Sequence, residues 1–233
     1  MSNELDLFDF DDSDFQEIDF DIDHEKRFCT PKKTRSKNVN YKNARKLSKE
    51  IKLSENDRYY CIVDGSFIFG DFIEAFIVDR DLRVKEMTLS TLSMSQENID
   101  SLANLLNGGF LDHLTIIISD YFYSHERNIL IKYMIDKLDK NDRFQLAICR
   151  THTKITFFET YSGSKVIMYG SANLRSSDNL EQFSIEMNDE LYDFNHFFHN
   201  KIVDKFKIIN KSLKTKQIWQ VINEIDQDQK GTQ

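Results

Sequence analysis

Three consecutive stretches decide the fold: residues 113–119, HLTIIIS, residues 124–138, SHERNILIKYMIDKL, and residues 144–149, FQLAIC. The first and third are short apolar runs, which are typical of buried strands. The middle stretch begins with Ser124, a residue type that often caps a helix, and it carries apolar residues at helical spacing. Strand, helix and strand in this order predict an α/β unit.

Further elements are expected on both sides of this unit. Helices are expected over residues 95–106, 188–206 and 216–225, and strands over residues 59–63, 83–92, 153–158, 165–169 and 181–187. Residues 71–78 could form a helix or a strand. Gly108-Gly109 is expected to end the helix over residues 95–106. The whole pattern predicts an α/β fold with a mixed β-sheet flanked by helices.

The composition suits one large domain with tails. The chain has 233 residues, and 40% of them are hydrophobic, so a sizeable core can form. A single proline and only 7 glycines argue against a turn-rich all-β protein. The formal net charge of -8 at first sight disfavours nucleic acid as a partner.

This average charge hides two opposite blocks. Residues 1–25 hold eleven acids without a lysine or arginine, whereas residues 26–49 hold ten basic residues without an acid. Without the eleven negative charges of the first block, the net charge changes from -8 to +3. An acidic block next to a basic block is a charge asymmetry that sets the N-terminal region apart from the rest of the chain.

The charge blocks suggest the domain boundaries. We expect residues 1–55 to be a disordered acidic tail and a basic linker, with a short helix near residues 41–51. The folded domain is expected over residues 56–210, and a terminal helix and tail over residues 211–233.

Two alternative roles are possible for each charge block. The basic segment either contacts nucleic-acid phosphates, with Tyr41 able to stack on a base, or serves as a soluble linker. The acidic tail either stays solvated or binds a protein partner. In a sharper hypothesis it is autoinhibitory and occupies the phosphate groove as a mimic of nucleic acid.

Cysteine usage and hydropathy predict a cytoplasmic protein. Cys29, Cys61 and Cys149 are isolated from one another, which fits a reduced compartment. The N-terminus is acidic, unlike a signal peptide, and no apolar run approaches the roughly 20 residues of a membrane span. A membrane is therefore not expected as a partner.

The chemistry is concentrated in two short motifs, His152-Thr153-Lys154 and Gly170-Ser171-Ala172-Asn173. Residues two apart on a strand point to the same face, so His152 and Lys154 are expected side by side. A nucleophilic imidazole beside a cation that binds phosphate is what phosphodiester chemistry on a histidine requires.

Together with Glu159 and with Asn179-Leu180-Glu181, these motifs resemble the HxK…D…GSxN signature of the phospholipase D superfamily. The resemblance covers roughly residues 110–190, and the single HxK motif is similar to that of nucleases in this family. The sequence departs from the pattern at Glu159, which stands where the family carries an aspartate.

The resemblance implies a role for each matched residue. His152 would attack phosphorus, while Lys154 and Asn173, with Ser171 nearby, would bind the non-bridging oxygens. Glu181 would hold the remote ring nitrogen of the histidine and fix its tautomer.

Three further residues complete the predicted site. Arg175 would contact a substrate phosphate, and Glu159 and Gly170 would support the local structure. No metal and no cofactor are expected. Because two histidines are needed and the chain has one HxK motif, the resemblance implies a homodimer in which each copy supplies half of the active site.

The favoured function is therefore a metal-independent nuclease that cleaves DNA or RNA. The alternatives are a catalytically weak nucleic-acid-binding module of the same fold, a phospholipase or phosphatidyltransferase, and an adaptor that uses its acidic tail. His196-x-x-His199 could form a metal pair on a helix, but without an evident third ligand ordinary histidines are the better interpretation.

Overall fold

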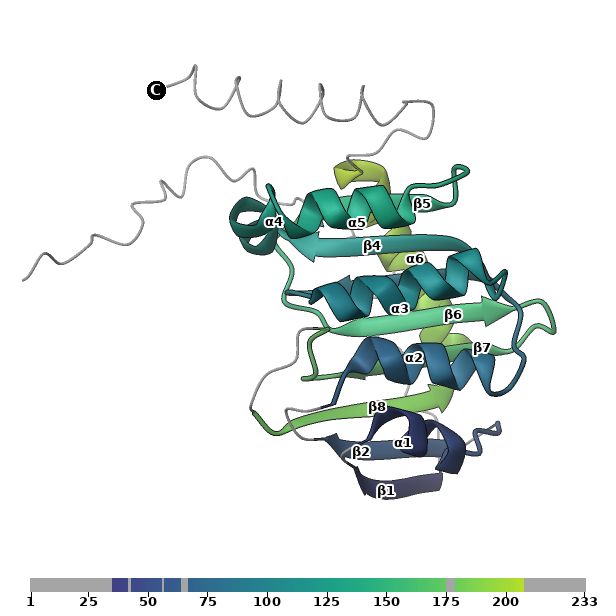
Figure 1. The fold of residues 1–233 in the computed structure, drawn as a ribbon. Helices are drawn as coiled ribbons and strands as arrows, with labels where there is room; N and C mark the ends of the chain where they lie inside the picture. Colours follow the sequence, from purple (N-terminus) through teal and green to yellow (C-terminus); the bar gives the residue numbers. More distant parts are fainter. Residues whose placement is uncertain (1–34, 42, 56, 64–66, 175–178, 208–233) are drawn as a thin grey trace, which may run out of the picture. The chain divides into compact units, whose positions relative to one another are not determined.

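The computed structural model describes residues 35–41, 43–55, 57–63, 67–174 and 179–207, which form one mixed sheet with helices on both faces (Figure 1). The strands are β1 (Arg35–Tyr41), β2 (Asp57–Val63), β3 (Val84–Thr91), β4 (Leu111–Ser119), β5 (Phe144–Cys149), β6 (Ile155–Thr160), β7 (Lys165–Gly170) and β8 (Glu181–Met187). The helices are α1 (Ala44–Glu50), α2 (Phe69–Val78), α3 (Gln96–Asn107), α4 (Asp120–Glu126), α5 (Leu130–Leu138) and α6 (Asp189–Phe206).

The strand order is β1-β2-β8-β7-β6-β3-β4-β5. Strands β3, β4 and β5 are parallel, as expected for an α/β unit, and β6 runs antiparallel to β3. Strands β6, β7 and β8 form an antiparallel meander, β2 is antiparallel to β8, and β1 is parallel to β2. The predicted fold class, a mixed α/β sheet, is therefore confirmed.

Two helical layers bury the two faces of the sheet. In Figure 1, α2 and α3 lie in front of the sheet and α6 lies behind it. The larger core lies on the side of α2 and α3 and includes the fully buried Phe72, Phe76 and Phe158. On the other side, Tyr192 of α6 packs against Phe157 of β6. Helix α6 contacts β5, β6 and β7, so it covers only part of its face of the sheet.

The expected helix over residues 124–138 is in fact two helices, α4 and α5. Ser119, the last residue of β4, caps α4 by accepting a hydrogen bond from the Phe122 N–H at 3.0 Å. Ser124 lies inside α4, and its hydroxyl donates to the Asp120 carbonyl at 2.9 Å. The expectation that Ser124 caps a helix was wrong because a serine next to the strand end supplies the cap first.

The expected linker also contains regular structure. Arg35–Tyr41 is a strand of the main sheet, which was not expected, and Ala44–Glu50 is the short helix expected near residues 41–51. Asp57, a buried residue at the start of β2, pairs with Arg35 (Nε–Oδ1, 2.8 Å) and Lys37 (Nζ–Oδ2, 3.0 Å). The basic side chains therefore attach β1 to the sheet. The acidic tail, residues 26–34 and the expected helix over residues 216–225 lie outside the described residues.

None of the described helices is long and apolar enough to cross a membrane.

Candidate active site

The loop that carries the HxK motif crosses one edge of the sheet. Because β4 and β3 lie between β5 and β6, residues 150–154 must span three strand spacings, roughly 14 Å. The six steps from Cys149 to Ile155 reach about 20 Å when fully extended, so the loop has little slack. His152 and Lys154 thus lie in an extended loop before β6, rather than in a strand as the sequence predicted.

Hydroxyl groups hold this loop against the end of β3. The Thr153 and Ser90 hydroxyls lie 2.6 Å apart, and the Thr151 and Thr153 hydroxyls lie 2.8 Å apart. The Thr153 N–H donates to the Thr151 hydroxyl at 3.2 Å. These contacts fix the backbone on both sides of His152. These hydroxyl groups were not among the predicted site residues, although the two threonines that flank His152 are a visible signal in the sequence.

The two motif side chains of the loop differ in environment. His152 is exposed, and its ring has no hydrogen-bond partner within the described part of the chain. Lys154 is half-buried, and its Nζ donates to the His152 carbonyl at 2.8 Å. The loop thus presents a solvent-accessible imidazole next to an ammonium group whose position is fixed.

The Gly-Ser motif reaches the same edge because β7 ends there. The Gly170 N–H donates to the Lys154 carbonyl at 3.2 Å, which joins the two motifs directly. A Cβ atom on Gly170 would lie 2.6 Å from the Phe183 Cα and still closer to the Gln182 carbonyl oxygen. Both are backbone atoms of β8, so this position requires glycine.

The start of β8 orients the serine of the motif. The Ser171 N–H donates to the Gln182 carbonyl at 2.9 Å, and the Gln182 N–H donates to the Ser171 hydroxyl at 3.1 Å. The Ser171 hydroxyl in turn donates to Glu181. Glu181 therefore lies at this edge, as the motif order suggests, but within one chain its partner is Ser171 and no bond to His152 occurs among the described residues.

Asn173 contains an unsatisfied polar atom. Its Oδ1 is buried and has no hydrogen-bond partner among the described residues. Both backbone groups of the next residue, Leu174, are hydrogen-bonded. Its N–H donates to the Thr91 hydroxyl at 3.5 Å, and its carbonyl accepts from the Ser95 N–H at 3.1 Å. An unpaired buried polar atom costs about 1–3 kcal/mol, so it marks a position where a ligand or water would be stabilised.

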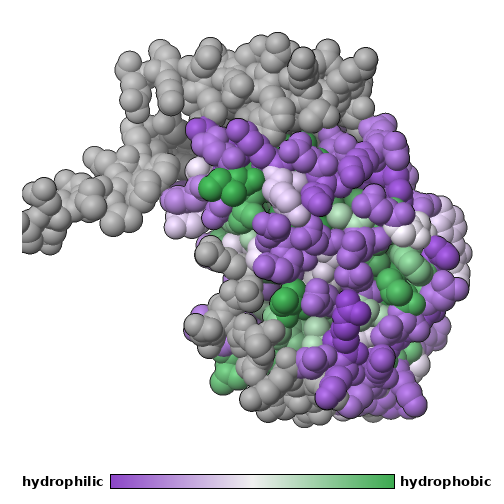
Figure 2. Space-filling model, viewed as in Figure 1, coloured by the Kyte–Doolittle hydropathy of each residue, from purple (hydrophilic) through white to green (hydrophobic). Residues whose placement is uncertain are grey.

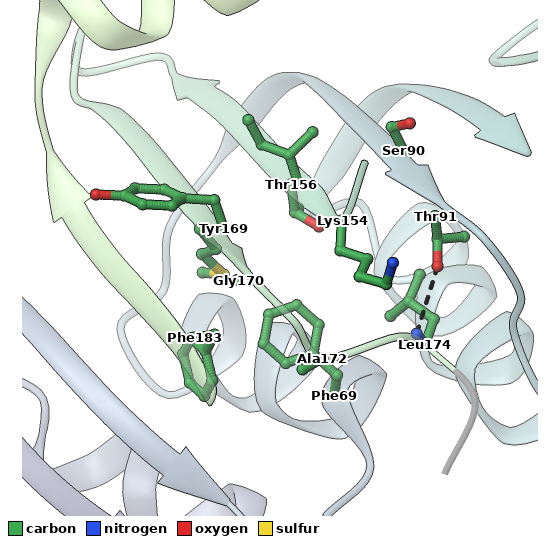
Figure 3. Close-up of a pocket in the computed structure, with 12 residues that line it drawn as sticks. Phe69, Ser90, Thr91, Lys154, Thr156, Tyr169, Gly170, Ala172, Leu174 and Phe183 are labelled. Carbon is green, nitrogen blue, oxygen red and sulfur yellow. Dashed lines mark hydrogen bonds between the residues drawn. The ribbon is translucent and has the colours of Figure 1, made fainter. Parts of the chain in front are cut away.

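A small pocket lies between the two motifs (Figure 3). Its volume is about 10 Å³, close to the space that one water molecule needs. Figure 3 shows Lys154 at this pocket, with Thr91 and Leu174 beside its ammonium group. The other lining residues are Phe69, Ser90, Ile155, Thr156, Met168, Tyr169, Gly170, Ala172 and Phe183.

Glu159 does not join this edge. It lies near the far end of β6, where it pairs with Lys85 of β3 at 2.9 Å. Arg175 lies outside the described residues. The structure therefore brings together six of the predicted residues, His152, Lys154, Gly170, Ser171, Asn173 and Glu181, at the edge where β3, β4 and β5 end. The carboxyl ends of parallel strands are a frequent place for ligands in α/β proteins.

Two titratable groups at this edge are unsuited to nucleophilic attack. Burial, with a smaller effect of Asp120, raises the pKa of Cys149 to about 11, so its thiol stays protonated at neutral pH. Burial and a 2.6 Å hydrogen bond to Glu186 raise the pKa of Tyr169 above its usual value. No group of three or more His, Cys, Asp or Glu that could hold a metal ion occurs in the described ranges.

No protein-family model and no curated protein sequence matches the chain. Among solved structures, it is similar to the phospholipase D family member Nuc from Salmonella typhimurium, with a TM-score of 0.44, 12% identity and coverage of 64% of this chain and 96% of Nuc. It is also similar to phosphatidylserine synthase from Haemophilus influenzae, with a TM-score of 0.48, 12% identity and coverage of 74% and 46%.

A polyphosphate kinase from Porphyromonas gingivalis is similar as well, with a TM-score of 0.46, 10% identity and coverage of 69% of this chain and 29% of the kinase. The chain thus spans less than half the length of the synthase and of the kinase. These likenesses concern the fold alone. They assign no activity to this chain, which must be argued from its own residues.

Proposed function

We propose that the protein is a metal-independent phosphodiesterase that cleaves nucleic acid through a phosphohistidine on His152. The observation that carries the proposal is the direct contact between the two motifs, in which the Gly170 N–H donates to the Lys154 carbonyl at 3.2 Å. This contact brings an imidazole, an ammonium group and a partly unsatisfied amide to one edge of the sheet. These are the groups that nucleophilic attack on a phosphodiester needs.

The proposed reaction has two displacement steps. A ring nitrogen of His152 attacks phosphorus, the bond to the leaving oxygen breaks, and that oxygen takes a proton from a second histidine. Water then attacks the phosphohistidine, the P–N bond breaks, and the second histidine accepts a proton from the water. Lys154 and Asn173 stabilise the negative charge that develops on the non-bridging oxygens. Rotation of the Asn173 amide by half a turn would direct its N–H group towards such an oxygen.

The second histidine would come from a second copy of the chain. A homodimer in which His152 faces His152 of the partner subunit across a two-fold axis supplies both groups with one motif per chain. Light scattering together with an activity assay tests this part. A protein that is monomeric and fully active would exclude the two-motif mechanism.

The main experiment is a cleavage assay in excess EDTA with labelled single-stranded DNA, duplex DNA and RNA. The wild type should cleave at least one of them. His152→Ala should lose at least about a thousandfold in rate, as expected when a nucleophile is removed. His113→Ala is the matched control, because His113 is an exposed histidine on β4 outside the site. Abolition of cleavage by EDTA would overturn the mechanism, and activity on lipid vesicles alone would exclude nucleic acid as the substrate.

One observation favours a second candidate, a nucleic-acid-binding module without catalysis. Within one chain the His152 ring has no described partner, and Glu181 is engaged by Ser171. Nothing in the described residues therefore fixes the tautomer that catalysis requires. Binding of nucleic acid that is unchanged in His152→Ala, together with absence of cleavage, would favour this candidate.

A further inference from the structure

Two aromatic rings of α4 lie at the same edge of the sheet as the candidate active site. Helix α4 starts directly after β4, and the Tyr121 side chain is 63% exposed. The Tyr121 and His125 rings lie 4.0 Å apart between centroids, tilted by 33°. The helix fixes this pair, because the Tyr121 N–H donates to Asp120 at 2.8 Å and His125 Nδ1 lies 2.8 Å from the Tyr121 carbonyl oxygen.

The sheet order places this ring pair close to the HxK motif. Strand β4 is two strands away from β6, so the end of β4 lies roughly 10 Å from the start of β6. The loop of residues 150–154 passes over the end of β4 on its way between β5 and β6. Arg150, at the start of this loop, has its Nε 4.0 Å from Asp120, the first residue of α4. The rings and the proposed phosphate site are therefore neighbours along one edge.

Tyr121 and Tyr161 are exposed to a similar extent, but they differ in the hydrogen bonding of their hydroxyl groups. Tyr161 is 61% exposed in the turn between β6 and β7, at the opposite edge, and its hydroxyl donates to Asp112. The Tyr121 hydroxyl has no partner within the described ranges. Apolar surface lies beside the ring pair as well, since Ile129 is 73% exposed just after α4. Figure 2 shows apolar surface near α4 within a mostly hydrophilic surface.

We propose that Tyr121 and His125 form a stacking platform for an unpaired base of a nucleic acid strand whose phosphate binds to the ammonium group of Lys154. Exposed aromatic rings beside a phosphate site bind bases through their faces, and every base has such a face. A duplex keeps its bases stacked inside, so the platform selects single-stranded substrate. The phosphate half of this proposal rests on the function proposed above, whereas the stacking half rests on α4.

The test measures binding by fluorescence anisotropy in the His152→Ala background, which prevents cleavage. The probes are a labelled oligothymidylate, an abasic strand with the same number of phosphates, and a duplex of the same length. Adding Tyr121→Ala should raise Kd for the oligothymidylate at least about fivefold, because stacking on an aromatic ring is worth about 1–3 kcal/mol per base. Kd for the abasic strand and for the duplex should stay unchanged.

Two control variants make the result specific. Tyr121→Phe keeps the ring and should bind like the parent, and Tyr161→Ala removes an equally exposed tyrosine from the other edge and should also bind like the parent. Equal Kd values for oligothymidylate with and without Tyr121 would overturn the proposal. An equal loss on all three probes would overturn it too, because it would reflect a general change in charge or folding.

The outcomes also separate this proposal from the proposed catalysis. Tyr121-dependent binding of bases without any cleavage in EDTA would support the platform and reject the nuclease. Cleavage lost in His152→Ala, with binding insensitive to Tyr121, would support the nuclease and reject the platform.

Discussion

The two edges of the sheet differ in the partners of their lysines. At the far edge, cations pair with carboxylates: Lys85 with Glu159, Lys165 with Asp193, and His196 with Glu86. At the edge with the two motifs, Lys154 donates to a backbone carbonyl and has no carboxylate partner in the described residues. The same edge contains the exposed His152 and the unsatisfied Asn173 oxygen.

We propose that this difference separates charges that stabilise the fold from charges that bind substrate. A paired charge is compensated by its neighbour, so its removal affects the fold more than it affects binding. A lysine that already lies in place without an acid can compensate the charge of an incoming anion. The following experiments compare matched residues from the two edges.

The largest effect is expected from a pair of lysine variants. Lys154→Ala should reduce nucleic-acid cleavage in EDTA at least about a hundredfold, because it removes a group that stabilises developing negative charge. Its free energy of unfolding should change by no more than about 0.5 kcal/mol. Lys165→Ala, from the far edge, should keep its activity and lose at most about 1 kcal/mol of stability. Equal activities in the two variants would show that the edges do not differ in function.

A pair of glycine variants should show the next largest effect. Gly170→Ala forces a Cβ against the backbone of β8, so the free energy of unfolding should fall by about 3 kcal/mol in urea titrations. Gly163→Ala, in the turn at the far edge, meets no atom within 4 Å but has a φ of +85°, so it should lose about 1 kcal/mol. The reverse order would contradict the close approach of β7 and β8.

The smallest effect is a pH dependence of stability carried by two histidines of α6. A hydrogen bond from His196 to Glu86 raises the pKa of His196, so this pair stabilises the fold fully below about pH 6.5, and the gain is lost as pH rises through the folded-state pKa. Burial lowers the pKa of His199, so its neutral form stabilises the fold fully above about pH 6.5, and stability is lost as pH falls.

Urea titrations across this range separate the two contributions. His196→Gln should cost most in acid, by less than about 1 kcal/mol because the pair is partly exposed. His199→Phe should instead reduce the loss of stability in acid. If His196→Gln destabilises equally at every pH, the His196–Glu86 ion pair makes no contribution.

The core strands could be predicted from sequence because burial on both faces demands a continuous apolar run. HLTIIIS met this condition and forms most of β4, whereas RSKNVNY did not and was expected to be linker. In the structure the second stretch is β1, which pairs with β2 along its backbone and through contacts of Arg35 and Lys37 with buried Asp57. A contact of this kind depends on tertiary structure, which local patterns do not contain.

Only part of the candidate site could be predicted from the sequence, because the rest also depends on tertiary structure. The order of the motifs identified the residues that meet at one edge, but it did not identify the loop that joins them. Alternation over residues 151–158 fits an extended loop as well as a strand, and only the strand order shows that the chain has to cross two strands before Ile155. The partner of Glu181 could not be predicted either, because Ser171 is ten residues away in the sequence and contacts it only in the folded chain.

The short loop of residues 150–154 limits which changes in sequence length the fold can accept. The loop connects the parallel half of the sheet to the antiparallel half, and its five residues barely span the strands between them. Substitution of a side chain there leaves the connection intact, whereas a deletion of two residues would leave too little chain to connect β5 with β6. For the fold alone, the number of residues between FQLAIC and ITFFET is therefore under tighter constraint than their identity. In a related sequence that has lost the motif, a preserved spacing would still reveal the same fold.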